Sequence, residues 1–216
     1  MQVAIVVYPG FTALDVLGPH EVLGRLPDTE VVFVAEHPGL VVNDLGSLSV
    51  HVDAGFADVP EPDVVLVGGG PGAHDQLADG SLHDWLRAVD RTAAWTTSVC
   101  TGSFVLAAAG LLAGRRATTH WSGLDQLADY GVTPSTERVV VDGHYATAAG
   151  VSAGIDMALT LSGLIAGDHV AQTVQLIIEY APEPPYRAGS VDSAPAEVFR
   201  SAVKTLTGSL PDEGAA

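Results

Sequence analysis

The sequence contains few of the residues from which disulfides and metal centres are built. Cys100 is the single cysteine among 216 residues. No internal disulfide is possible, nor a cysteine-based zinc or iron–sulfur cluster. The eight histidines include no H-x-x-x-H or H-E-x-x-H pair, so we expect no metal site. A lone thiol is typical of a reducing compartment, and we expect a cytoplasmic protein.

Positive charge is also scarce. Lysine and arginine together number 9 against 26 aspartates and glutamates, a net charge of −17, and Lys204 is the single lysine. Nucleic acids and anionic membranes require clustered positive charge, so the composition argues against both as partners. No apolar run approaches 18 residues, and the N-terminus has no basic segment followed by a cleavage site. We therefore expect neither a membrane span nor a signal peptide.

The remaining composition is that of a folded domain of ordinary size. Apolar residues make up 47% of the chain and charged residues only 16%, which excludes disorder as the main state. The length suits one domain, which we assign to residues 1–207, with a flexible tail at 208–216. No internal repeat or long linker interrupts it.

Strand-like and helix-like patterns alternate along the chain. Short apolar runs predict strands at 3–7, 30–35, 40–42, 48–52, 63–67 and 95–99, and a hairpin from 138–141 and 144–147. Helical spacing predicts helices at 12–25 (kinked or in two parts at Gly18-Pro19), 81–90, 101–109, 122–130 (capped by Ser122 and ended by Gly131), 152–166, 168–180 and 195–206. This alternation predicts an α/β three-layer sandwich with a mainly parallel central sheet.

Cys100 occupies the most informative position. A buried strand stops at Val99 and a helix of small residues begins at once, which places the sulfur in a strand-to-helix turn above a helix N-terminus. The helix dipole and unpaired N–H groups would lower the thiol pKa, giving a reactive nucleophile. The alternative is a buried structural cysteine, which is common for a lone cysteine.

A glycine-rich turn, Gly68-Gly69-Gly70-Pro71-Gly72, follows another buried strand. Open α/β sheets bind ligands at this edge, and glycines let backbone N–H groups approach a ligand. The spacing matches neither the dinucleotide fingerprint nor the Walker phosphate loop, so we expect no nucleotide and no organic cofactor. The alternative is a tight connection with no ligand.

Two further residues are candidates at the same edge. Asp15 lies in the first turn of the first helix, where burial and a neighbouring thiolate would favour its protonated form and fit it for acid–base work. Alternatively it only complements the helix dipole. His120 lies in Thr118-Thr119-His120-Trp121 and could reach Cys100, or serve as a hydrogen-bonded structural histidine.

Together these motifs resemble the DJ/PfpI superfamily. The matching segments are 14–20 (LDVLGPH), 98–103 (SVCTGS), 106–112 (LAAAGLL), 116–121 (RATTHW) and 175–182 (QLIIEYAP). The resemblance covers nearly the whole chain and implies a flavodoxin-like, class I glutamine amidotransferase-like fold. Within the superfamily the sequence is most similar to the subgroup that hydrates organic isonitriles.

The resemblance implies roles for the residues. Cys100 would be the nucleophile, Asp15 its acidic partner, and Thr101 would contribute its N–H or hydroxyl. Gly68, Gly69 and Gly70 would supply further backbone donors. The protease-like branch has a histidine immediately after its cysteine; here Thr101 stands there, which argues against peptidase activity.

The expected reaction is the cofactor-independent addition of water to a small uncharged isonitrile through a cysteine thioimidate, giving an N-substituted formamide. Two alternatives stay open. One is another cysteine-dependent hydrolase or a glyoxalase-like enzyme, with His120 as base; the other is a small-molecule-binding or oxidation-sensing protein without turnover. By resemblance we also expect a homodimer, with the stretches 159–165 and 176–180 as candidate surfaces.

Overall fold

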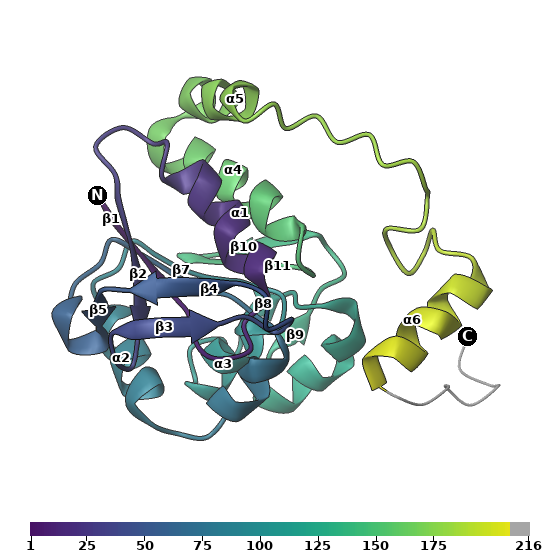
Figure 1. Ribbon diagram of the computed structural model, residues 1–216, viewed down its shortest axis with the longest axis horizontal. Coiled ribbons are helices and arrows are strands. Elements are labelled where there is room, and N and C mark those ends of the chain that lie inside the picture. Colours follow the sequence, from purple (N-terminus) through teal and green to yellow (C-terminus); the bar gives the residue numbers. More distant parts are fainter. Residues whose placement is uncertain (208–216) are drawn as a thin grey trace. The chain divides into compact units, whose positions relative to one another are not determined.

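The computed structural model describes residues 1–207, of which residues 1–179 form an α/β sandwich around one large sheet (Figure 1). The predicted flexible tail, 208–216, lies outside the described residues. The chain divides into two compact units, Met1–Glu179 and Tyr180–Ala216. The first contains the whole sheet; the described part of the second contains one helix, α6 (Ala196–Thr207).

The sheet has seven strands in the order β10-β11-β7-β6-β1-β2-β5. The strands are β1 (Gln2–Val6), β2 (Glu30–Ala35), β5 (Ala54–Gly55), β6 (Val64–Val67), β7 (Trp95–Val99), β10 (Val139–Asp142) and β11 (Tyr145–Ala148). All neighbours pair in parallel except β10 and β11, which form the predicted antiparallel hairpin. The mainly parallel sheet is therefore confirmed.

Two layers of helices cover the sheet. On one side α1 (Ala13–Leu23) packs on α4 (Ala153–Ala166), and α5 (Asp168–Ile177) packs outside α4; on the other side lie α2 (Ser81–Val89) and α3 (Gly102–Ala108) (Figure 1). Because both faces are covered, β1, β6 and β7 are buried along almost their whole length. This burial explains their continuous apolar sequences.

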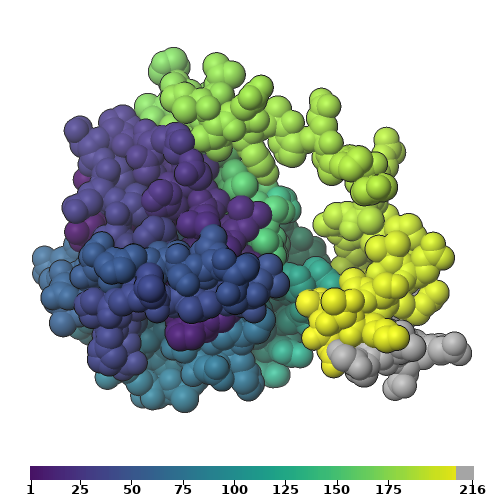
Figure 2. Space-filling view, in the orientation of Figure 1, coloured from purple at the N-terminus to yellow at the C-terminus, as the bar shows by residue number. Residues whose placement is uncertain are grey.

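Small elements complete the first unit. Two short two-stranded sheets are formed by β3 (Gly39–Val42) with β4 (Ser49–Val52), and by β8 (Arg116–Ala117) with β9 (Thr133–Pro134). The dark-blue residues of the β3–β4 hairpin lie across the near surface in Figure 2. Four 3-10 helices, η1 to η4, span Phe56–Asp58, Pro71–Gln76, Trp121–Gly123 and Asp125–Tyr130.

The structure corrects two local predictions. The first helix is not divided in two at Pro19: α1 runs without interruption from Ala13 to Leu23 with Pro19 inside it. The helix predicted from Ser122 is two 3-10 helices instead, and its cap is His120, whose side chain accepts a hydrogen bond from the Ser122 N–H. Gly131, with φ of 73°, ends the second as expected.

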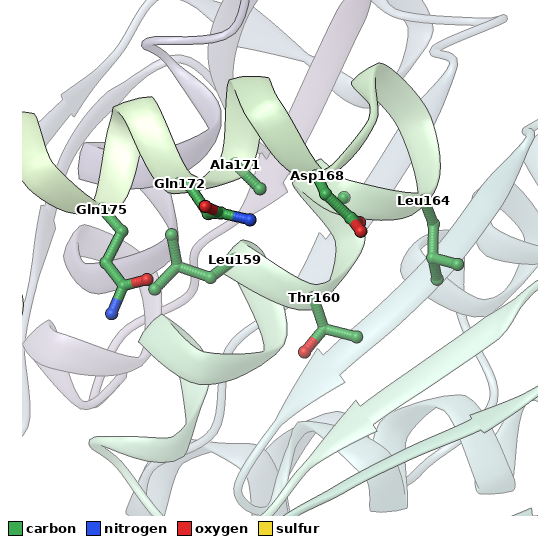
Figure 3. A pocket seen from close by; sticks show the side chains of 8 residues that line it. Leu159, Thr160, Leu164, Asp168, Ala171, Gln172 and Gln175 are labelled. Carbon is green, nitrogen blue, oxygen red and sulfur yellow. The ribbon is translucent and has the colours of Figure 1, made fainter.

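The two stretches proposed as association surfaces divide between core and surface. Leu161 is fully buried, whereas Leu164, Leu176 and Ile177 are exposed. A groove of about 370 Å³ runs between α4 and α5; in Figure 3 Leu159 and Leu164 come from α4, and Gln172 and Gln175 from α5. No described helix has the length and apolar character that crossing a membrane demands.

The backbone crossing between β6 and α3 imposes a strict size limit at Gly102. A Cβ there would lie 2.1 Å from the carbonyl oxygen of Val67. We predict that Gly102→Ala lowers the free energy of unfolding by about 3 kcal/mol, because backbone has to move to admit the methyl group. Urea unfolding followed by circular dichroism measures the loss.

Gly110 provides the matched control. Its φ is +83°, but a Cβ there meets nothing within 4 Å. Gly110→Ala should therefore cost only about 1 kcal/mol, the price of the left-handed backbone. Equal losses at the two glycines would contradict the steric explanation.

Candidate active site

The carboxyl ends of four neighbouring strands converge on Cys100. β11, β7, β6 and β1 are adjacent and parallel, and each is followed by a segment that reaches the same edge of the sheet. Cys100 follows β7, the glycine turn follows β6, Asp15 lies on the helix after β1, and Val151 follows β11. This is the edge at which open parallel sheets bind ligands.

Cys100 sits in a strained turn. Its φ is +57°, in the left-handed region that side chains other than glycine rarely adopt. Two hydroxyl groups hold its carbonyl oxygen, Ser103 Oγ at 3.0 Å and Thr119 Oγ1 at 2.9 Å, and its own N–H donates to the carbonyls of Ala148 and Ala149. The sharp turn aims the sulfur out of the end of β7, as in a nucleophile elbow.

Asp15 is the partner of Cys100. Its side chain is fully buried; Oδ2 accepts a 2.8 Å hydrogen bond from the Gly69 N–H, and the Cys100 thiol hydrogen-bonds to its carboxylate. Oδ1 has no hydrogen-bond partner among the described residues. Burial raises the pKa of Asp15 to about 7, although the bonds from Gly69 and Cys100 oppose the shift. The shift has the expected direction and burial is its main cause, but the contact with Cys100 lowers the pKa instead of raising it as the predicted thiolate would.

The expected low pKa of the thiol is wrong. Burial raises the pKa of Cys100 to about 12, and the negative charge of Asp15 raises it further. N–H groups of Val151 and Thr101 and the Thr101 hydroxyl act in the opposite direction by bonding the sulfur, but they do not outweigh burial. α3 has only seven residues, so its dipole is weak.

The two groups therefore titrate as a pair. Burial raises both pKa values, and the charge of Asp15 raises that of Cys100 further, so the first proton leaves the pair near the carboxyl pKa of about 7 and the second leaves only near 12. Between these values one proton serves both groups. A thiolate is then available whenever that proton moves to the carboxyl group.

The backbone of the glycine turn holds the Asp15–Cys100 pair in place. The Gly69 N–H bonds to Asp15, and the Gly70 N–H donates to Thr101 Oγ1 at 2.9 Å. Two of the three predicted donors, the N–H groups of Gly69 and Gly70, are thus occupied by protein. The carbonyl of Gly68 accepts the hydroxyl of Tyr8, so this glycine too is tied into the protein framework. A Cβ on Gly69 would lie 2.5 Å from the Thr101 nitrogen, which explains why the turn needs glycine.

His120 lies close to the pair but is not bonded to it. Its Nδ1 is 2.7 Å from Ser122 Oγ, and its ring packs against Gly150, next to Val151. Burial lowers its pKa, so the imidazole is neutral at pH 7. No hydrogen bond joins it to Cys100 in the described part of the chain. Its observed role is to cap a 3-10 helix.

Sequence reasoning missed two contributors. The Val151 N–H bonds the sulfur from a residue with φ of 39°, and Tyr8 is buried beside the pair, where burial and the charges of Asp15 and Cys100 raise its pKa well above the usual value. Both residues follow the carboxyl ends of predicted strands, and that position is the only feature of the sequence that could have pointed to them. The side chains do not indicate which backbone amide turns toward the sulfur.

The described residues contain no cluster of three or more histidine, cysteine or acidic side chains able to hold a metal ion.

Comparison with known proteins places the chain in a family: the DJ-1/PfpI family matches residues 1–163. The chain belongs to the DJ-1/PfpI family.

Relatives within this family differ in what they do. The chain is 43% identical to isonitrile hydratase of Pseudomonas putida, over 97% of this chain and 92% of that protein. It is similar to the crystal structure of a THiJ/PfpI family protein from Pseudomonas syringae (TM-score 0.91, 38% identity, 96% of this chain and 86% of that one). It also matches the HTH-type transcriptional regulator CdhR of Pseudomonas aeruginosa at 40% identity, but over only 44% of this chain and 29% of the regulator.

The raised pKa of Asp15 makes stability depend on pH. The folded protein binds this proton more tightly than the unfolded chain, whose aspartates titrate near 3.9. Asp15 therefore contributes fully to stability below pH 4 and loses that contribution as pH rises through about 7. We predict that Asp15→Asn, which ends this loss, is more stable than wild type at pH 8 by about 2–4 kcal/mol.

Urea unfolding of both proteins at pH 5 and pH 8 measures the difference. Asp75→Asn, which removes an exposed carboxylate elsewhere, serves as control and should track wild type at both pH values. If Asp15→Asn is less stable at pH 8 than at pH 5 by as much as wild type, the buried carboxyl is not the cause.

Proposed function

We propose that this protein hydrates organic isonitriles to N-substituted formamides, with Cys100 as nucleophile and Asp15 as acid–base partner. The observation that carries the proposal is the buried Asp15–Cys100 pair, in which the thiol hydrogen-bonds to a carboxylate that is itself held by the Gly69 N–H. An isonitrile needs both members of such a pair, since its terminal carbon must gain a nucleophile and a proton. The 43% identity to an isonitrile hydratase over nearly the whole chain supports the same activity.

In the first half-reaction the pair adds to the isonitrile carbon. The Cys100 thiolate forms a C–S bond to that carbon while the carboxyl group of Asp15 delivers its proton to the same carbon. The product is a thioimidate, R–N=CH–S–Cys, next to an Asp15 carboxylate. The N–H groups of Val151 and Thr101 bond the sulfur and so stabilise the attacking thiolate.

In the second half-reaction water replaces sulfur. The Asp15 carboxylate takes one proton from water as the oxygen bonds to the thioimidate carbon, and returns that proton to the nitrogen. Its unpartnered Oδ1 is an acceptor available for this water. The C–S bond then breaks, the hydroxyl proton returns to the pair, and R–NH–CHO leaves. Atoms balance as isonitrile plus water, and no oxidant, reductant or cofactor enters.

Ligand binding without turnover is a second candidate, favoured by the match to part of a transcriptional regulator. The two candidates differ in whether isonitrile is consumed. Steady formation of formamide by purified wild-type protein, detected by mass spectrometry and lost in Cys100→Ser, supports the hydratase.

We propose a cytoplasmic location, where a lone cysteine stays reduced. We also propose a homodimer that associates through the groove between α4 and α5 together with the exposed residues Leu164, Leu176 and Ile177. Light scattering at micromolar concentration should give twice the chain mass. Leu176→Lys should shift the mass toward a monomer, and a monomeric wild type would contradict the proposal.

Substitutions at Asp15 and His120 separate the two possible bases. Asp15→Asn should lose on the order of a hundredfold or more in turnover, because the amide bonds the sulfur but carries no transferable proton. Alkylation of Cys100 at pH 7 should be faster than in wild type, because the charge that raises the thiol pKa is gone. His120→Ala should cost less than tenfold.

Initial rates with benzyl isonitrile, together with iodoacetamide modification rates, measure both effects. Cys100→Ala sets the background. Near-normal turnover in Asp15→Asn with a severe loss in His120→Ala would assign the base role to histidine and point to a cysteine–histidine hydrolase.

The pH profile provides an independent test. Below pH 7 both members of the pair are protonated and no thiolate exists; above it, one proton has left. kcat/KM should therefore rise through about pH 7 and level off at higher pH. If His120 were the essential base, kcat/KM would rise below pH 6.5 instead, because burial lowers the pKa of His120. Stopped-time assays from pH 5 to 9.5 distinguish the two limbs.

A further inference from the structure

A cavity of about 450 Å³ opens directly beside the elbow. Thr101 and Gly70 line it, and these are the residues joined by the hydrogen bond from the Gly70 N–H to Thr101 Oγ1. The Thr101 hydroxyl also bonds the Cys100 sulfur. A single side chain thus touches both the nucleophile and the cavity, so a molecule bonded to the sulfur has this cavity next to it.

The cavity is far larger than the reacting group requires. An isonitrile carbon and nitrogen together with one attacking water need a small fraction of 450 Å³, since a water takes about 30 Å³ in the liquid. The volume lies in the range of pockets that enclose whole small molecules. The remaining space therefore suits the group attached to the isonitrile nitrogen.

The floor of the cavity is apolar and partly aromatic. Ala73 and Phe104 are buried, Leu77 is half-buried, and the Phe104 ring meets the edge of the Tyr130 ring at a centroid distance of 6.0 Å. Gly123 leaves room for Phe104, since a Cβ there would lie 2.8 Å from the ring. Such a floor is suited to stacking a flat apolar group.

The rim is polar and exposed. Gln126 and Asp129 lie on η4, and His74 lies on η2, all at the solvent side of the cavity. None of the described lining residues is a lysine or arginine, and Asp129 adds a carboxylate to the rim. The lining therefore disfavours carboxylate- or phosphate-bearing substituents and suits an uncharged one best.

We propose that this cavity is the binding site for the substituent of the isonitrile, and that it selects bulky, uncharged, aromatic-sized groups over small ones. The proposal rests on the proposed hydratase activity and names its substrate class. Leu77 and Phe104 bind the apolar body of the substituent, and Thr101 marks the point where the reacting end leaves the cavity toward Cys100.

Filling the cavity tests the proposal. Leu77→Trp should lower the ratio of kcat/KM for benzyl isonitrile to that for methyl isonitrile at least tenfold relative to wild type, because only the larger substrate needs the space. Using the ratio cancels any general loss of activity. Gln126→Trp, at the exposed rim, gives a second filling variant that leaves the buried floor intact. Leu40→Trp, on the exposed β3–β4 hairpin, is the control and should keep the wild-type ratio.

A binding measurement separates this proposal from the hydratase proposal. Calorimetry with N-benzylformamide on Cys100→Ala detects occupancy without chemistry, and binding should weaken at least tenfold when Gln126→Trp is added. If wild type hydrates no isonitrile but this binding and its loss are observed, the hydratase proposal fails and the cavity assignment stands. If both filling variants keep the ratio within twofold of wild type, or if filling leaves the binding of N-benzylformamide unchanged, the cavity assignment is overturned.

Discussion

The burial of two acids side by side, Asp15 and Cys100, is the constraint on which the site depends. Removal from water raises the pKa of both groups, and the negative charge of Asp15 raises that of Cys100 further. The fold has to hold both groups away from water while keeping the thiol within hydrogen-bonding reach of the carboxylate. It does so with elements already required by the sheet: α1 carries Asp15, the turn after β6 holds it through the Gly69 N–H, and the end of β7 presents the sulfur.

Keeping the pair in place has local costs that the rest of the fold offsets. Cys100 and Val151 both have positive φ, each costing on the order of 1–3 kcal/mol. Gly69 and Gly102 permit backbone contacts that any side chain would block. β1, β6 and β7 are almost entirely buried in the large core beneath the site. The hydrophobic free energy of this core offsets the cost of the strained and partly charged edge.

The sequence predicts the sheet and the meeting of Asp15 with Cys100, because buried strands have continuous apolar sequences and parallel strands end at one edge. It did not predict the thiol pKa. Position above a helix N-terminus suggests a lowered value, but the outcome depends on how deeply the sulfur is buried and how close the carboxylate lies, and neither is written in local residue patterns. The same holds for hydrogen bonds: the N–H groups of Gly69 and Gly70 exist in any conformation, and only the folded chain shows that Asp15 and Thr101 already occupy them. Ser122 is of a residue type that commonly caps helices, but in the folded chain the Ser122 N–H donates to the His120 side chain, so His120 is the cap.

A raised thiol pKa is compatible with catalysis when the proton it holds is the one the reaction needs. A permanently ionised cysteine would add to an isonitrile carbon and leave an unstable anion, since no acid would stand beside it. In the pair, forming the thiolate and forming the acid are one event, because the proton that leaves sulfur arrives on Asp15. Because both side chains are buried, water screens this coupling little. In the proposed reaction the pair acts only on the reacting carbon, so selectivity for the rest of the substrate does not have to come from it. The proposal assigns that selectivity to the neighbouring cavity floor, where Leu77 follows η2 and Phe104 lies on α3.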